Sequence, residues 1–180
     1  MIRKDRYLVS KKKEIHILFD KQHSATDKMI AKQMETILRQ GGYQVNRVDE
    51  SGGESEDGEC INRILKENQR TLGDEEKESV EYTPQLLVSV NMAGFHARMS
   101  DGSPYLNKLP LNILVYLDRW EDSFGPWFEN RMNITTEFLV AKDLIRSEIR
   151  SRGVKLHRVE LCESLDQDLL RYIDTMDWRF

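Results

Sequence analysis

Short apolar runs alternate with longer amphipathic stretches along most of the chain. The runs are rich in β-branched residues and are bounded by Gly, Pro, Asn or Asp, which is typical of strands in a buried sheet. The stretches that follow several of them carry apolar residues at helical spacing. This alternation predicts an α/β fold, a three-layer sandwich with a mostly parallel sheet of five or six strands, Rossmann/flavodoxin-like in type. The predicted strands are 14–20, 43–49, 85–91, 111–118, 137–142 and 154–161.

Polar residues mark the starts of the predicted helices, and glycines mark several of their ends. Ser24 followed three residues later by Asp27 resembles a capping box, and Ser164 with Gln167 shows the same pattern. In both places the serine would accept a hydrogen bond from an unpaired N–H at the helix start. The predicted helices are one that follows the box at Ser24 and runs to Gln40, ended by Gly41-Gly42; 61–72, ended near Gly73; a short one entered at Pro126; one capped by Asp143 and closed by Gly153; and one that opens at Ser164 and runs through Met176 to Trp178.

Length and composition favour a single domain. A chain of 180 residues with 39% hydrophobic residues can bury a sizeable core but has no room for two large domains. We expect a basic arm at 1–13 and one α/β domain at 14–180. Residues 50–81 carry eleven Asp and Glu against four Lys and Arg, and within them 50–59 is predicted to be an acidic loop. Because the arm is the only basic cluster, no nucleic acid partner is expected.

The two cysteines and the hydropathy of the chain indicate its cellular compartment. Cys60 and Cys162 have no second Cys or His at ligand spacing, so no metal site is expected. Each lies beside an apolar residue and is interpreted as a small buried thiol in a reducing compartment, with a long-range disulfide left open. No stretch approaches 18 apolar residues and no signal peptide is visible. A cytoplasmic protein without a membrane span is therefore predicted.

The segment after the strand 85–91 is the first candidate site. Parallel α/β sheets bind ligands beyond the carboxyl ends of their strands, and Asn91 and Asp118 each close a predicted strand. Gly94 permits close approach of the backbone, while His96 and Arg98 could pair with an anion. Two interpretations of Asp118 stay open, orientation of a hydroxyl-bearing ligand and capping of the next segment. A structural loop is the alternative for the whole segment.

The turn after the first strand is the second candidate. The start of a helix offers unpaired N–H groups to phosphate, although this turn has no glycine and so contains neither a Rossmann fingerprint nor a Walker loop. Ordinary helix capping is the alternative. His16 lies inside a strand and is predicted to be a packing residue. No catalytic residue is assigned, and the predicted ligand-binding residues are His23, Ser24, Thr26, Asn91, Gly94, His96, Arg98 and Asp118.

Two known families share the order of strands and helices. Receiver domains carry a phosphorylatable Asp at the end of the third strand, where this chain has Asn91, and we reject that interpretation. Residues 15–48 resemble flavodoxins in strand, turn, helix and following strand. Their hydroxyl-rich, glycine-containing phosphate loop is replaced here by 21–27. We therefore expect neither FMN nor another cofactor.

A third resemblance covers about residues 84–161. It rests on PQLLVSVN at 84–91, Ser103-Pro-Tyr105, ILVYLD at 113–118, Phe138-Leu-Val and the stretch 145–153. These segments resemble the N-terminal half of GT-B glycosyltransferases of the spore-maturation type. The resemblance implies a glycosyltransferase-related module that binds a sugar or nucleotide-sugar. Those enzymes hold the nucleotide-sugar mainly in a C-terminal domain. The resemblance therefore also implies that this chain is one half of such an enzyme and is completed by a protein partner. Whether the chain has enzymatic activity of its own stays open. The alternative is a non-catalytic small-ligand or protein-interaction domain of flavodoxin-like fold.

Overall fold

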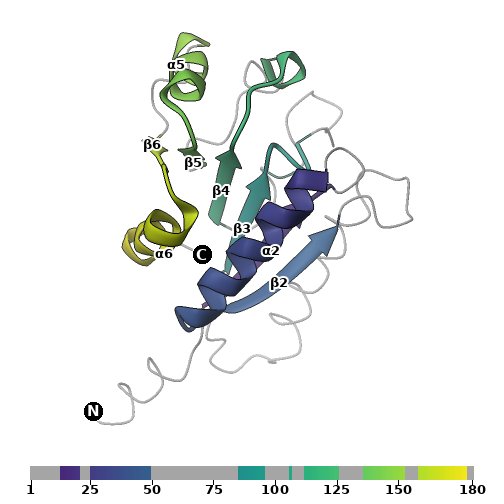
Figure 1. The fold of residues 1–180 in the computed structure, drawn as a ribbon, viewed down its shortest axis with the longest axis vertical. Coiled ribbons are helices and arrows are strands. Elements are labelled where there is room, and N and C mark those ends of the chain that lie inside the picture. Colours follow the sequence, from purple (N-terminus) through teal and green to yellow (C-terminus); the bar gives the residue numbers. More distant parts are fainter. Residues whose placement is uncertain are drawn as a thin grey trace, which may run out of the picture.

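The residues that the structure describes form one six-stranded sheet in which every neighbouring pair of strands is parallel (Figure 1). The computed structural model describes residues 13–20, 25–49, 85–95, 106, 112–125, 136–152 and 158–177. The predicted α/β fold with a parallel sheet is confirmed. The strands are β1 (Glu14–Phe19), β2 (Gln44–Asp49), β3 (Gln85–Val90), β4 (Asn112–Leu117), β5 (Glu137–Val140) and β6 (Val159–Leu161).

The strand order is β2-β1-β3-β4-β5-β6. From β1 the chain moves outward to β2, then returns past β1 to β3, and from there each new strand is added on the far side. The direction of strand addition thus reverses between β1 and β3. In open α/β sheets such a reversal leaves a crevice at the carboxyl ends of the two strands, because the connections leave them toward opposite faces.

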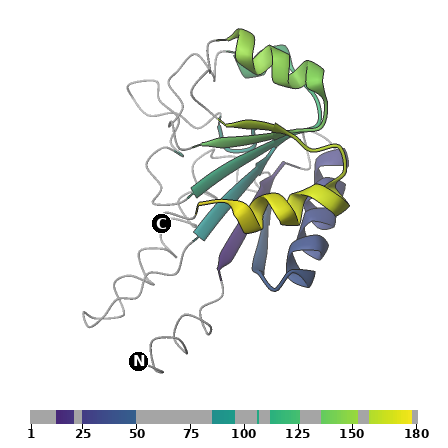
Figure 2. The ribbon, with the colours of Figure 1, turned by 90° about the vertical axis from the view of Figure 1, so that its left-hand side faces the viewer.

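Helices cover both faces of the sheet (Figure 2). The helices α2 (Ala25–Gln40) and α6 (Leu165–Thr175) bury their apolar residues against one face, and α5 (Asp143–Ser151) buries Ile145 and Ile149 against the other. Strands β3 and β4 are buried at all six positions, which explains why their sequences are mostly apolar and do not alternate with exposed polar residues. None of the helices within the described ranges is long and apolar enough to cross a membrane.

The glycine end of α2 forms as predicted, whereas two predicted caps do not. Gly42 has a φ of 93°, and the Tyr43 N–H donates to the Leu38 carbonyl at 3.1 Å, the bonding pattern of a Schellman end. Ser164 precedes α6 but makes no capping bond through its side chain, so the predicted box with Gln167 is wrong. The Asp168 carboxylate accepts from the Ser164 N–H instead, at 3.2 Å. Asp143 also does not cap α5. It is the first helical residue, pairs with Arg146, and Lys142 takes the cap position.

Several predicted segments differ in extent or lie outside the described residues. The described part of the last strand is only 159–161, and a 3₁₀ helix at Asp122–Phe124 precedes the helix predicted to enter at Pro126. His16 is a packing residue as predicted, 3% exposed and hydrogen-bonded through Nε2 to Gln85 Oε1 at 3.0 Å. The basic arm up to residue 12, the acidic loop 50–59, the helix 61–72 and the helix at Pro126 lie outside the described residues.

Cys162 is a free, buried thiol directly after β6, as the sequence predicted. Burial and the nearby Asp168 carboxylate raise the pKa of this thiol to about 11. We expect iodoacetamide to alkylate Cys162 at pH 8 on the order of 100-fold more slowly in the folded protein than in urea, because little of the thiol is ionised and it is shielded from solvent. Mass spectrometry of the peptide that contains Cys162 measures both rates. Equal rates would contradict the assignment.

Candidate functional site

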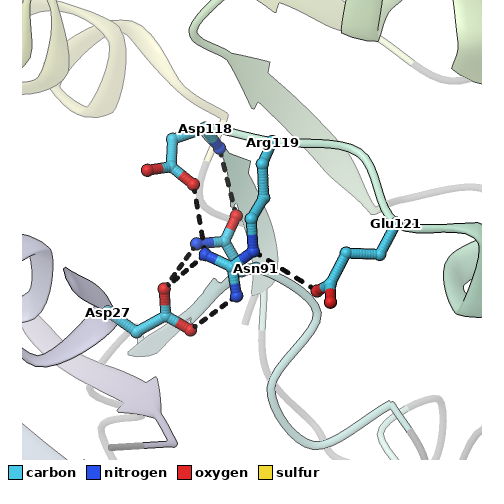
Figure 3. A network of polar contacts seen from close by, with 5 residues as sticks. All are labelled: Asp27, Asn91, Asp118, Arg119 and Glu121. Atoms are coloured by element: carbon cyan, nitrogen blue, oxygen red, sulfur yellow. Dashed lines mark hydrogen bonds and ion pairs between the residues drawn. The ribbon is translucent and has the colours of Figure 1, made fainter. Parts of the chain in front are cut away.

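Polar side chains from three parts of the chain meet at the carboxyl edge of the sheet (Figure 3). Asp27 lies in the first turn of α2, the helix that follows β1. Asn91 directly follows β3, and Asp118 and Arg119 directly follow β4. The meeting point includes the ends of β1 and β3, where the direction of strand addition reverses. This is the position at which α/β sheets of this kind bind their ligands.

Asp27 is the centre of the cluster. Its carboxylate is almost completely buried, with the residue 1% exposed, and both of its oxygens accept hydrogen bonds. Arg119 donates from Nη1 to Oδ1 at 2.7 Å and from Nη2 to Oδ2 at 3.2 Å, which is a two-pronged pair. Asn91 Nδ2 donates to the same Oδ1 at 2.8 Å. A buried carboxylate needs such partners, because water no longer solvates its charge.

Asn91 links the three parts of the chain that form the cluster. Besides donating to Asp27, its side-chain oxygen accepts a hydrogen bond from the Asp118 N–H at 3.1 Å. Its own N–H donates to the Tyr116 carbonyl in β4 at 2.8 Å. One amide side chain therefore fixes the start of α2, the turn after β3 and the end of β4 relative to one another.

The backbone after β3 is tightly turned. Asn91 and Met92 both have left-handed backbones, with φ values of 52° and 65°, and Gly94 follows with a φ of 88°. Asn and Gly adopt this region at little cost, but for Met it costs about 1–2 kcal/mol. Met92 is 1% exposed and Phe95 is fully buried, so packing beneath the turn holds it in place. Strained turns of this kind are concentrated at functional sites.

The outer part of the cluster carries more negative than positive charge. Arg119 lies between three carboxylates, since it pairs with Asp27 and also contacts Asp118 at 3.4 Å and Glu121 at 3.3 Å. Its hydrogen bonds to Asp27 raise the pKa of the guanidinium further, and burial opposes this effect. The side chains of Asp118 and Glu121 are 25% and 30% exposed. With one guanidinium against three carboxylates, these four side chains have a net charge of −2.

Four of the eight predicted ligand-binding residues lie within the described part of the chain. Asn91 and Asp118 are brought together directly, Gly94 lies in the turn after Asn91, and Thr26 is next to Asp27 in α2. Asp118 contacts Arg119 instead of capping the following 3₁₀ helix, whose cap position is taken by Glu121. The cap interpretation of Asp118 is therefore wrong. The other four lie outside the described residues: His23, Ser24, His96 and Arg98.

Sequence reasoning missed the charged centre of the cluster. The sequence pattern indicates only a capping role for Asp27 and does not distinguish Arg119 or Glu121 from other charged residues. A signal for Asp27 exists, because positions 27, 31, 34 and 38 share one helix face and three of them are apolar. An acidic residue on a buried face requires a partner, and an arginine directly after a buried strand is a natural candidate. Across the described ranges, no group of three or more His, Cys, Asp and Glu is arranged to hold a metal ion.

No protein-family model, curated protein or solved structure matches this chain.

Proposed function

We propose that the chain binds a sugar or nucleotide-sugar where β1, β3 and β4 end, as a glycosyltransferase-related module that a protein partner completes. The observation that carries the proposal is the strand order β2-β1-β3-β4-β5-β6, with its reversal between β1 and β3. The polar cluster lies at the carboxyl edge where this reversal favours a ligand site. The class of ligand comes from the resemblance of residues 84–161 to GT-B N-terminal halves.

The geometry of the cluster supports binding more than catalysis. Both oxygens of Asp27 are engaged by Arg119 and Asn91, so Asp27 is poorly placed to take a proton from a substrate. We assign it the role of fixing Arg119 and Asn91. Asp118 and Glu121 remain partly exposed, so a ligand could reach their carboxylates. Sites that bind polar small molecules use a few such groups on a rigid frame.

Calorimetric titration tests the proposal. The panel is UDP-glucose, UDP-N-acetylglucosamine, GDP-mannose, CMP-N-acetylneuraminate and the free sugars glucose, N-acetylglucosamine and mannose. We expect at least one member to bind the wild-type protein with a dissociation constant of about 1 mM or tighter, as polar contacts at a strand edge can provide. If no member binds at millimolar concentration, the proposal is wrong.

Replacement of Arg98 by Ala addresses the loop after β3. If Arg98 contacts an anionic or hydroxyl-rich ligand, its removal is expected to cost about 1.5–3 kcal/mol of binding, which is about 10- to 150-fold in affinity. The melting temperature should barely change, because arginines in loops are seldom buried without a partner. Titration of wild type and Arg98→Ala with the same ligand, with thermal melts of both, measures the two effects. Equal affinities would exclude Arg98 from the site.

An interaction domain is the second candidate. Met29 and Leu144 are 71% and 73% exposed, and each lies in the first turns of a helix that begins at the carboxyl edge, α2 and α5. A protein partner that covered this edge would bury both side chains. A negative result with the whole titration panel would make it the better description of the chain.

A further inference from the structure

Asp118 has one carboxylate oxygen that no residue in the described part of the chain uses. Its Oδ1 contacts Arg119 Nη1 at 3.4 Å, and its backbone N–H donates to Asn91. Oδ2 has neither a hydrogen bond nor an ion pair with any described residue and points away from the guanidinium (Figure 3). An ionised carboxylate can only accept hydrogen bonds. Asp118 therefore presents an open acceptor at the end of β4, beside the reversal between β1 and β3.

This acceptor is held in place before any ligand arrives. The backbone of Asp118 is bonded to the Asn91 side chain, which is itself fixed by Asp27, and the carboxylate is steadied by Arg119. Of these partners, Asp27 and Asn91 are 1% and 4% exposed, so the support is rigid. A preorganised acceptor loses little conformational freedom when it binds a donor.

The charge around Asp118 Oδ2 favours a neutral hydrogen-bond donor over an anionic group. Arg119 is the cation of the cluster, and it is shared by Asp27, Asp118 and Glu121. A phosphate placed against Asp118 would meet the net charge of −2 that Asp27, Asp118, Arg119 and Glu121 carry together, whereas a sugar hydroxyl is neutral and can donate to Oδ2. A hydrogen bond from a neutral hydroxyl to an ionised acceptor is also stronger than one between two neutral groups.

From the open oxygen and the charge balance we infer that Asp118 accepts a hydrogen bond from a sugar hydroxyl. The part of the site at the end of β4 would then recognise the sugar of a nucleotide-sugar and not its phosphates. The inference rests on the proposed function and adds to it the part of the ligand that is recognised. Asp27, Asn91 and Arg119 are positioning residues, because they act through Asp118.

The test compares each nucleotide-sugar that binds with its own bare nucleotide. Wild-type protein is titrated with UDP-glucose and UDP, and with GDP-mannose and GDP, and then with the free sugars glucose and mannose. The nucleotide-sugar is expected to bind at least 10-fold more tightly than the nucleotide alone. In Asp118→Asn, which keeps the size of the side chain and removes its charge, we expect this advantage to fall by about 10-fold while the affinity for the bare nucleotide stays within 2-fold.

Glu14→Gln is the matched control, because Glu14 is a partly exposed carboxylate at the opposite, amino end of β1. It should leave every affinity unchanged, and thermal melts verify that both variants are folded. If bare nucleotides bind wild type as tightly as their sugar conjugates, or if Asp118→Asn keeps the full advantage of the sugar, the inference is overturned and the proposed function stands. If no sugar or nucleotide-sugar binds wild type, both fall together. Should Asp118→Asn not fold, Asp118→Glu, which keeps the charge but moves the carboxylate, is titrated in its place and is expected to lose the same advantage; an unchanged advantage would overturn the inference.

Discussion

Replacing Arg119 with Met is expected to lower the free energy of unfolding by about 3–5 kcal/mol, since it leaves the Asp27 carboxylate buried without its cation. Met keeps much of the aliphatic length of Arg, so the loss reports the charge more than the packing. For a chain of this size the melting temperature should fall by roughly 6–20 °C. Urea unfolding followed by circular dichroism measures the change.

A second substitution separates the buried charge from other effects. Adding Asp27→Asn to Arg119→Met removes the uncompensated charge and keeps an acceptor for the Asn91 side chain. The double variant should therefore be more stable than Arg119→Met alone, an unusual case in which a further substitution at a buried position restores stability. Arg171→Met is the control, because Arg171 is 74% exposed and its pair with Asp168 should contribute less than about 1 kcal/mol. A double variant less stable than Arg119→Met would contradict the assigned role of Asp27.

Phe95→Ala is expected to cost about 3–5 kcal/mol, the usual range for truncation of a buried aromatic side chain. Phe95 is fully buried in the cluster of apolar residues between the sheet and α5. Its N–H also donates to the Met92 carbonyl at 3.1 Å, so it closes the turn that carries Asn91. If a sugar or nucleotide-sugar binds wild type, we expect the variant to lose affinity for it as well as stability, because the turn would no longer be held from beneath.

The matched control for Phe95→Ala is Leu144→Ala. Leu144 lies on α5, which covers the same face of the sheet, but it is 73% exposed. Its truncation should change the free energy of unfolding by less than about 0.5 kcal/mol. Equal losses in the two variants, measured by urea unfolding, would show that Phe95 does not anchor the turn.

The sheet was predictable because its signal is repeated many times. β3 and β4 are buried at every position, and a short, continuous apolar run bounded by polar residues is typical of a strand covered on both faces. The Gly41-Gly42 end of α2 was equally clear, because Gly42 adopts a backbone conformation that other residues avoid. Strand order was not predictable, since pairing depends on which apolar faces meet in three dimensions.

The candidate site was predicted in position but only partly in content. Asn91 and Asp118 were found because they end apolar runs, a feature that is local in the sequence. The pairing of Asp27 with Arg119 joins residues 92 positions apart, and neither residue alone shows that it has a buried partner. The burial of Phe95 was not predicted either, because it has no local signal in the sequence. It lies between Gly94 and His96 in a segment without strand or helix periodicity, so nothing nearby shows that its ring enters the core.

The failed caps have a local cause. Ser164, Gln167 and Asp168 all lie within reach of the same helix start, and the shorter, charged Asp168 side chain bonds to the Ser164 N–H. A charged acceptor forms a stronger hydrogen bond to an N–H than an uncharged amide does. At α5, Asp143 is only one position beyond the cap, where it still favours the positive end of the helix. Such choices between adjacent residues are decided by small energy differences that a sequence pattern does not resolve.

The strand order also determines when the sheet can be completed on the ribosome. β1, α2 and β2 are synthesised first, but β3, the strand that pairs with the second edge of β1, begins about 35 residues after β2 ends. At translation rates of about 5–20 residues per second, this leaves the inner edge of β1 without its partner for roughly 2–7 s. An unpaired edge is a template for association with other chains. We therefore expect the inner edge of β1 to be open to association with other chains for those seconds, until β3 pairs with it.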